Sequence, residues 1–198
     1  MSINNVPIQN VAKFKILGAL LNQNPMESNM NEIKSKIMMA QKQFGKKKNI
    51  LQNRKIFLQI RVQILNTTIR PVLLYSVETM AITKQHLRKI ESFYINLLRQ
   101  MVNGGTKRNN NHSYFYTNLQ IMEITKTNSI IDHIFKLQQR FLGHQIRKEN
   151  SNLIKQIIFH EAKSLKIGRP IKTLLLHVVE NMEVDISQFY RMTLERYL

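Results

Sequence analysis

The spacing of the apolar residues constrains this chain more than any other feature. Long stretches repeat apolar residues at steps of three and four, which is the period of one face of an α-helix. These positions are Ile33, Ile37, Ala40 and Phe44; Leu87, Ile90, Phe93 or Tyr94, Leu97 and Met101; Ile130, Ile134, Leu137 and Phe141; and Leu153, Ile154, Ile157 and Ile158. The sequence therefore predicts a mainly α fold, a bundle of amphipathic helices.

Residues 11–21 depart from this helical pattern. Phe14 and Ile16 alternate with lysines, and Gly18 suits a turn, so a short N-terminal β element is predicted here. Residues 1–28 are expected to hold this element and a turn, and the first helix to begin at about residue 29.

Turn-forming and capping residues set the helix boundaries. A second helix is predicted over residues 54–69, where Pro71 then interrupts or restarts it, and Thr83 suits the N-cap of the next helix. The glycines in residues 103–105 are expected to end that helix. The inward residues of the second helix are expected to be Phe57, Ile60, Ile64 and Leu65.

The polar stretch at residues 106–118 is predicted to be a loop and is the best candidate for a domain boundary. We therefore divide the helical part into residues 29–105 and residues 106–198. Another break at residues 166–172 leaves two short helices at the end of the chain.

Charge is the strongest signal about partners. The 198 residues include 30 Lys and Arg against 12 Asp and Glu, a formal net charge of +18. Such a surface indicates a polyanionic partner, and nucleic acid (RNA, DNA or an RNA–DNA hybrid) is the leading interpretation. An acidic protein, a membrane surface, or a charge without a selected purpose are the alternatives.

Several classes of protein are excluded or disfavoured by composition. The chain has no cysteine, which removes disulfides, thiol nucleophiles and cysteine-ligated zinc. No apolar run approaches the ~18 residues that a membrane-spanning helix needs. The first residues resemble neither a signal peptide nor a transit peptide. We expect a soluble intracellular protein of the nucleus or cytoplasm that is not secreted.

Residues for catalysis are scarce. A two-metal polymerase site needs converging carboxylates, yet the only aspartates are Asp132 and Asp185, far apart in the sequence. The six histidines form no close metal-ligand pair, and no phosphate-binding glycine loop is present. The sequence therefore predicts no catalytic residue, no metal site, no cofactor and no small-molecule substrate.

Five segments stand out as landmarks of the sequence: "VAKFKILGALL", "NEIKSKIMMAQKQFGKKKNIL", "RPVLLYSVETMAIT", "FLGHQIRKENSNLIKQIIF" and "GRPIKTLLLHVVENM". Taken in order, they resemble the C-terminal part of LINE-type (non-LTR) retrotransposon reverse transcriptases. The first resembles the segment before the thumb of that family, and the second the helix after it. The third is similar to a Pro-x-Leu-Leu-Tyr-Gly-x-Glu-x-Trp stretch, and the last two resemble a Leu-Gly-His-x-x-Arg segment and a Gly-Arg-Pro ending.

This resemblance covers about residues 11–198 and implies a helical thumb-like bundle followed by a post-thumb region. Residues 1–28 would then be a remnant of the junction between palm and thumb. The matched signature residues are Arg70, Pro71, Leu74, Tyr75, Glu78, Gly143, His144, Gly168 and Pro170. Ser76 stands where the family usually has glycine, and Met80 where it has tryptophan.

The resemblance also implies a role for Glu78, a lone carboxylate that follows an apolar run. It matches a structural signature of the thumb, and we expect Tyr75 or Arg70 to hold it by a hydrogen bond or an ion pair. The aspartates that bind Mg²⁺ in this family belong to the palm, upstream of residue 1. The chain is therefore expected to grip template–primer nucleic acid without polymerising.

The predicted phosphate contacts centre on the lysine run that follows the first amphipathic helix. They are Lys34, Lys42, Lys46, Lys47, Lys48, Arg54 and Lys55, with Arg147 and Arg169 behind them. The alternative is a solvated face that aids solubility. Tyr114, Phe115 and Tyr116 are suited to stack on bases or, as we prefer, to pin the loop onto the core.

Other functions are compatible with the same pattern. The chain is suited to serve as a domesticated helical subunit that binds RNA or protein within an assembly. It also fits a retrotransposon remnant without a selected function. The rest of a polymerase is a possible partner for the first interpretation.

Overall fold

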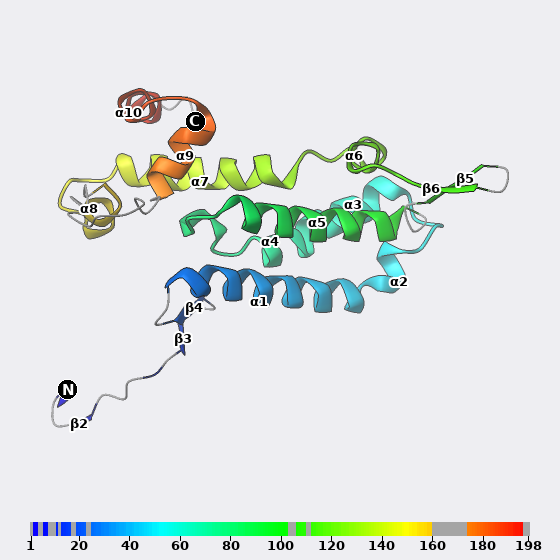
Figure 1. Cartoon of the computed structure of the whole chain (residues 1–198), viewed down its shortest axis with the longest axis horizontal. Helices are drawn as coiled ribbons and strands as arrows, with labels where there is room; N and C mark the ends of the chain where they lie inside the picture. The colour runs from blue at the N-terminus through cyan, green and yellow to red at the C-terminus, as the bar shows by residue number, and fades with distance from the viewer. Residues whose placement is uncertain are drawn as a thin grey trace.

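Helices form most of the chain in the computed structural model, which describes residues 2–3, 6–7, 11, 13–16, 19–22, 25–102, 106–109, 112–159 and 174–195 (Figure 1). The predicted mainly α fold is therefore confirmed. The helices are α1 (Pro25–Lys46), α2 (Lys48–Leu51), α3 (Leu58–Thr68), α4 (Arg70–Leu73), the 3₁₀ turn η1 (Val77–Thr79), α5 (Lys84–Met101), α6 (Asn118–Thr125), α7 (Ile130–Ile146), α8 (Leu153–Phe159), α9 (Leu174–Met182) and α10 (Ile186–Leu194).

Short antiparallel strand pairs complete the described chain. They are β1 (Ser2–Ile3) with β2 (Val6–Pro7), β3 (Lys13–Ile16) with β4 (Ala19–Asn22), and β5 (Thr106–Asn109) with β6 (His112–Phe115). The N-terminal β element is thus present, with Phe14 opposite Leu21. Within the loop predicted at residues 106–118, Thr106–Asn109 and His112–Phe115 pair as strands instead, because backbone pairing needs no apolar alternation. The glycines at residues 103–105 lie outside the described residues.

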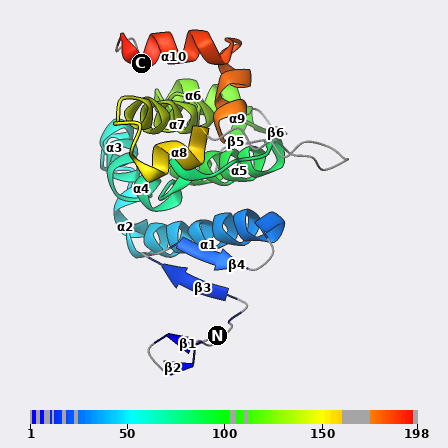
Figure 2. The same ribbon diagram turned by 90° about the vertical axis from the view of Figure 1, so that its left-hand side faces the viewer.

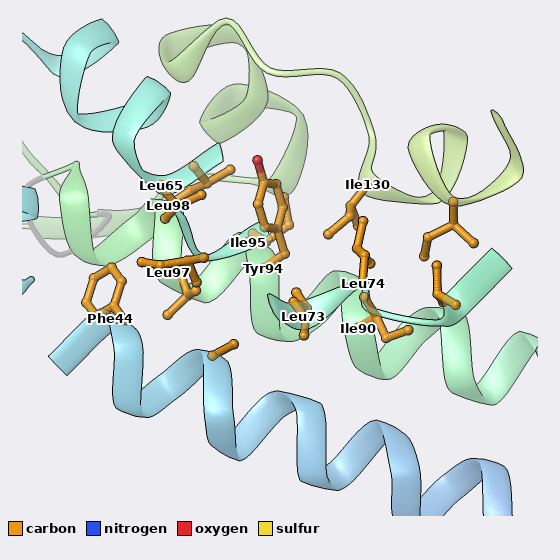
Figure 3. Close-up of a cluster of buried hydrophobic side chains, with 14 of the residues drawn as sticks. Phe44, Leu65, Leu73, Leu74, Ile90, Tyr94, Ile95, Leu97, Leu98 and Ile130 are labelled. Atoms are coloured by element: carbon orange, nitrogen blue, oxygen red, sulfur yellow. The ribbon is translucent and has the colours of Figure 1, made fainter. Parts of the chain in front are cut away.

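The long helices are arranged in layers. Figures 1 and 2 show α1 along one side of α5 and α7 along the other, with α3 and α4 beside α5. Leu65 of α3, Leu73 of α4 and Leu97 of α5 belong to one cluster of buried side chains (Figure 3). This larger cluster of buried side chains extends from Ile33 in α1 to Ile134 in α7.

A second cluster of buried side chains lies towards the C-terminus. It joins Leu142 and Ile146 of α7 to Val178 of α9 and Phe189 of α10. Both clusters therefore include residues of α7. The domain boundary that we placed at residue 106 stays a prediction.

The inward face of the second predicted helix is corrected. Phe57 and Ile60 are 78% and 48% exposed, while Leu65 is fully buried and Ile64 half-buried. The helix begins at Leu58 rather than at residue 54, and its buried face carries Arg61, Val62 and Leu65. Helical spacing fixes which residues share a face, but not which of two apolar rows meets the core.

The helix predicted from Leu153, Ile154 and Ile157 is present as α8. These three side chains are 67%, 49% and 67% exposed. The two short helices predicted after them are α9 and α10.

The start of α5 follows the prediction closely. The Thr83 hydroxyl accepts a hydrogen bond from the backbone N–H of His86, and His86 Nδ1 accepts one from the backbone N–H of Thr83. Burial, and then the charge of Lys89, lower the pKa of His86, which favours the neutral ring that this cap requires. Tyr94, rather than Phe93, occupies the buried position between Ile90 and Leu97.

Candidate nucleic-acid interface

The connection between α1 and α3 gathers five of the predicted cations. Lys46 ends α1, Lys47 and Lys48 lead into α2, and Arg54 and Lys55 lie in the turn before α3. All are exposed except Lys47, which is half-buried. We call these five residues the basic tip; it lies at one end of the layered helices (Figure 1).

Two further predicted cations extend the basic tip along α1. Lys34, Met38, Lys42 and Lys46 follow one another at steps of four and are all exposed. Residues at this spacing form one row on a helix surface. We call Lys34, Lys42 and Lys46 the α1 row, and it leads into the basic tip.

Acidic residues are missing from this part of the sequence. The chain has none between Glu32 and Glu78, a stretch that carries ten lysines and arginines. Among the described residues, the ion pair found joins Glu32 to Lys36, whose Nζ lies 2.9 Å from Glu32 Oε1. Lys36 also lies over the Tyr75 ring, 4.6 Å from its centroid, and is buried. Lys36 thus has a structural role, while the side chains of the α1 row remain exposed.

Arg61 is a buried residue that holds the backbone next to the basic tip, and the sequence interpretation missed it. Its Nε donates to the carbonyl oxygen of Ile56 at 2.9 Å, and its guanidinium donates to the carbonyl oxygens of Leu51 at 3.0 Å and Met101 at 2.8 Å. These contacts join the end of α2, the turn after it and the end of α5.

The burial of Arg61 also affects its pKa. Burial, and then the charge of Arg54, lower the pKa of Arg61 from its ordinary value. The available sequence signal was position, because Arg61 precedes Leu65 by one helical step on the apolar face. A buried arginine satisfied by carbonyl oxygens is a structural residue and not a phosphate contact.

Exposed apolar side chains accompany the cations of the basic tip. Phe57 directly follows the turn that carries Arg54 and Lys55, and Ile50 and Ile60 are 44% and 48% exposed. An exposed aromatic ring beside cations is suited to stack on a base while the cations contact phosphates. Sequence reasoning placed Phe57 inward and therefore missed it.

Arg147 is exposed but also makes a contact within the fold. It follows α7 and donates a hydrogen bond of 2.9 Å to the carbonyl oxygen of Thr193 in α10. Gly143 is buried, and a Cβ there would meet Thr193 Cγ2 at 3.4 Å, while His144 is exposed. Gly143 and Arg147 thus join α7 to α10. Arg169, Gly168 and Pro170 lie outside the described residues.

The segment at residues 70–80, which we call the α4–η1 junction, corrects the expectation for Glu78. In the part of the chain that the structure describes, the expected bond of Glu78 to Tyr75 or Arg70 is not made. Tyr75 is 51% exposed and lies beneath Lys36 instead. The backbone reverses at Ser76, whose φ is 61°, and this turn separates α4 from Glu78.

Packing, rather than the carboxylate, holds the α4–η1 junction. Leu74 and Val77 are buried in the larger cluster, and Pro71 lies exposed in the first turn of α4. Gln138 of α7 is fully buried, and its Nε2 donates to the carbonyl oxygens of Val77 at 3.3 Å and Met80 at 2.9 Å. Gln138 was not predicted, because a glutamine on an apolar helix face gives no sign of its partner.

The structure describes the side chain of one residue of the aromatic run at residues 114–116, which lies at the end of the hairpin formed by β5 and β6. Tyr116 packs against the larger cluster, and its carbonyl oxygen accepts a hydrogen bond from Arg99 at 3.2 Å. This agrees with the preferred interpretation that the run pins the segment to the core. The side chains of Tyr114 and Phe115 lie outside the described residues.

The two aspartates have separate places. Asp132 lies in the first turn of α7, and Asp185 caps α10 by accepting a hydrogen bond of 2.7 Å from the backbone N–H of Gln188. The described residues contain no group of three His, Asp or Glu side chains arranged to hold a metal ion. Within the same residues, every helix is too short or too polar to cross a membrane.

Comparisons with protein-family models, with curated proteins and with solved structures gave no match to this chain.

Proposed function

We propose that this chain binds nucleic acid through the basic tip and the α1 row, as the thumb and post-thumb portion of a LINE-type reverse transcriptase. In this role it grips the template–primer duplex and leaves polymerisation to a palm that carries the metal-binding aspartates. The observation that carries the proposal is that the cations of the α1 row and the basic tip are exposed, apart from the half-buried Lys47, and that no carboxylate lies between Glu32 and Glu78 in the sequence.

The geometry supports phosphate contacts along a strand. Lys34, Lys42 and Lys46 succeed one another along a helix edge, and the basic tip continues that line. Each Lys or Arg that contacts a phosphate releases counterions and makes the affinity salt-dependent. The family assignment itself rests on the sequence resemblance alone.

A salt-titrated anisotropy assay tests this function. The purified chain is titrated with an RNA–DNA hybrid, duplex DNA and heparin. A hybrid that binds more tightly than both competitors, with a steep salt slope, supports a thumb-like grip. Equal binding to all three contradicts it, because charge alone then explains the affinity.

A matched pair of variants locates the interface. Replacing Lys46, Lys47 and Lys48 by alanine is expected to lower affinity and flatten the salt slope by about 2–3 units. Replacing the exposed Lys84, Arg88 and Lys89 of α5 by alanine removes the same charge away from the basic tip. An equal loss in both variants contradicts the proposed interface.

The exposed apolar residues of α8 favour a second candidate function, a helical subunit of an assembly that binds RNA or protein. Leu153, Ile154 and Ile157 are suited to contact another chain. Co-purification with other proteins at fixed stoichiometry, lost on replacing Leu153 and Ile157 by serine, would support it.

A further inference from the structure

A cavity of about 240 Å³ lies where α3 ends, α4 begins and the connection from α6 reaches α7. It belongs to a different layer from the α1 row, since Figure 3 shows Tyr94 rising from α5 on the side away from α1. The lining residues are Asn66, Arg70, Tyr94, Lys126, Thr127, Asn128, Ser129, Ile130, Asp132, His133 and Lys136. It therefore stands apart from the proposed interface.

The charge of the lining is strongly positive. Arg70 comes from α4, Lys126 from the end of α6 and Lys136 from α7, so separate elements direct cations to one hollow. Among the described residues that line the cavity, Asp132 is the only carboxylate. With His133 neutral, the lining carries a net charge of +2, which matches the charge of about −1.5 to −2 of a phosphate monoester at pH 7.

One wall of the cavity is held by a hydrogen bond of its own. The Tyr94 hydroxyl donates to Asn66 Oδ1 at 2.6 Å. Burial raises the pKa of Tyr94, and the nearby charge of Arg70 opposes the shift, so this hydroxyl stays neutral. Arg70 and Tyr94 thus lie together in the lining of the cavity.

The pKa of His133 responds to the positive charge around the cavity. Burial lowers the pKa of His133, and the charges of Arg70, Arg140 and Lys136 lower it further. A dianion bound in the cavity would oppose these charges and raise this pKa. His133 is therefore a reporter of occupancy, with Tyr94, Lys126 and Asp132 as the other titratable groups around it.

We propose that this cavity binds a dianionic phosphate group, with Arg70, Lys126 and Lys136 as its cationic contacts. The group belongs either to free inorganic phosphate or to the terminal phosphate monoester of a nucleic-acid strand. A backbone phosphodiester carries one negative charge and is flanked on both sides by nucleotides, so it matches a small hollow of charge +2 less well. This inference does not depend on the basic tip.

Inorganic phosphate titrated into the whole chain tests the proposal, with chloride at matched ionic strength as the reference. We expect saturable binding by calorimetry and a shift of the His133 ring resonances. The double variant Lys126→Gln, Lys136→Gln should weaken binding at least tenfold. Both lysines are exposed, so their replacement is expected to leave the fold intact, as circular dichroism will check.

The control variant is Arg88→Gln, Lys89→Gln, which removes the same charge from exposed positions of α5. It should bind phosphate as the natural chain does. Equal weakening in both double variants, or no difference between phosphate and chloride, would overturn the proposal.

Short oligonucleotides distinguish the two sources of phosphate. On a background with Lys46, Lys47 and Lys48 replaced by alanine, a 5′-phosphorylated strand is compared with its 5′-hydroxyl form. A gain from the 5′-phosphate that the Lys126, Lys136 variant abolishes supports the cavity with a strand end as ligand. Phosphate binding without that gain supports it with the free anion. Either result stands even if the basic tip proves not to bind nucleic acid.

Discussion

The basic tip and the α4–η1 junction each connect helices through a short irregular segment. At the basic tip, Lys46, Lys48 and Arg54 are exposed. The neighbouring Arg61 is buried and donates hydrogen bonds to carbonyl oxygens. At the α4–η1 junction, Gln138 donates hydrogen bonds to the carbonyl oxygens of Val77 and Met80. Arg70 lines a cavity. The comparison separates polar groups that hold the backbone from those that remain available for a ligand.

The largest expected effect is the loss of Arg61, which tests whether the basic tip depends on a buried residue. Arg61→Ala leaves the carbonyl oxygens of Leu51 and Met101 without their donor, so we expect a loss of about 3 kcal/mol in the free energy of unfolding. Urea denaturation measures it. The exposed Arg54→Ala should change stability by less than about 0.5 kcal/mol. Similar values for the two variants would contradict the assigned role of Arg61.

The corresponding change at the α4–η1 junction is Gln138→Leu. It removes the donor to Val77 and Met80 while keeping the volume, and we expect a loss of about 2 kcal/mol in stability. Hydrogen exchange should show faster opening of the backbone amides at residues 77–80. Gln63→Leu, at an exposed position of α3, should leave this exchange unchanged. Unaltered exchange in Gln138→Leu would show that packing alone holds the junction.

Phe57→Ala is expected to change binding and not stability, unlike the two variants above, because this ring is exposed. We predict a stability change within about 0.5 kcal/mol. Affinity for single-stranded RNA should fall by about 1 kcal/mol, roughly fivefold, through lost stacking. Ile60→Ala removes a neighbouring exposed apolar side chain that has no ring, and should bind as before. A fall in stability without a fall in affinity would assign Phe57 to the fold.

The smallest expected effect is a gain, at the turn of the α4–η1 junction. Ser76 adopts a φ of 61°, which disfavours side chains with a Cβ. Ser76→Gly removes this strain but adds freedom to the unfolded chain, so we expect a net gain of about 0.5 kcal/mol in stability. Ser92→Gly, within α5, should instead lose about 0.5 kcal/mol. Thermal unfolding of both variants measures the two signs, and a loss at both positions would contradict the strain at Ser76.

The local sequence determined the helices and their caps, because periodicity and capping act within a few residues. The face of α5 through Leu87, Ile90 and Leu97 and the cap at Thr83 were both predicted correctly. The exposed lysines of the α1 row also followed from helical spacing alone. Their binding role stays a proposal.

The tertiary structure alone decided which polar groups are buried and what they contact. Nothing near Arg61 or Gln138 in the sequence identifies Met101 or Val77 as a partner, since these residues are 40 and 61 positions away. The cavity likewise joins Arg70 to Lys136 across the packing of α4 and α7. Hydrophobic burial is non-directional and fixes only which face turns inward, whereas a buried hydrogen bond requires a specific donor at a specific carbonyl oxygen, which only the packed fold supplies.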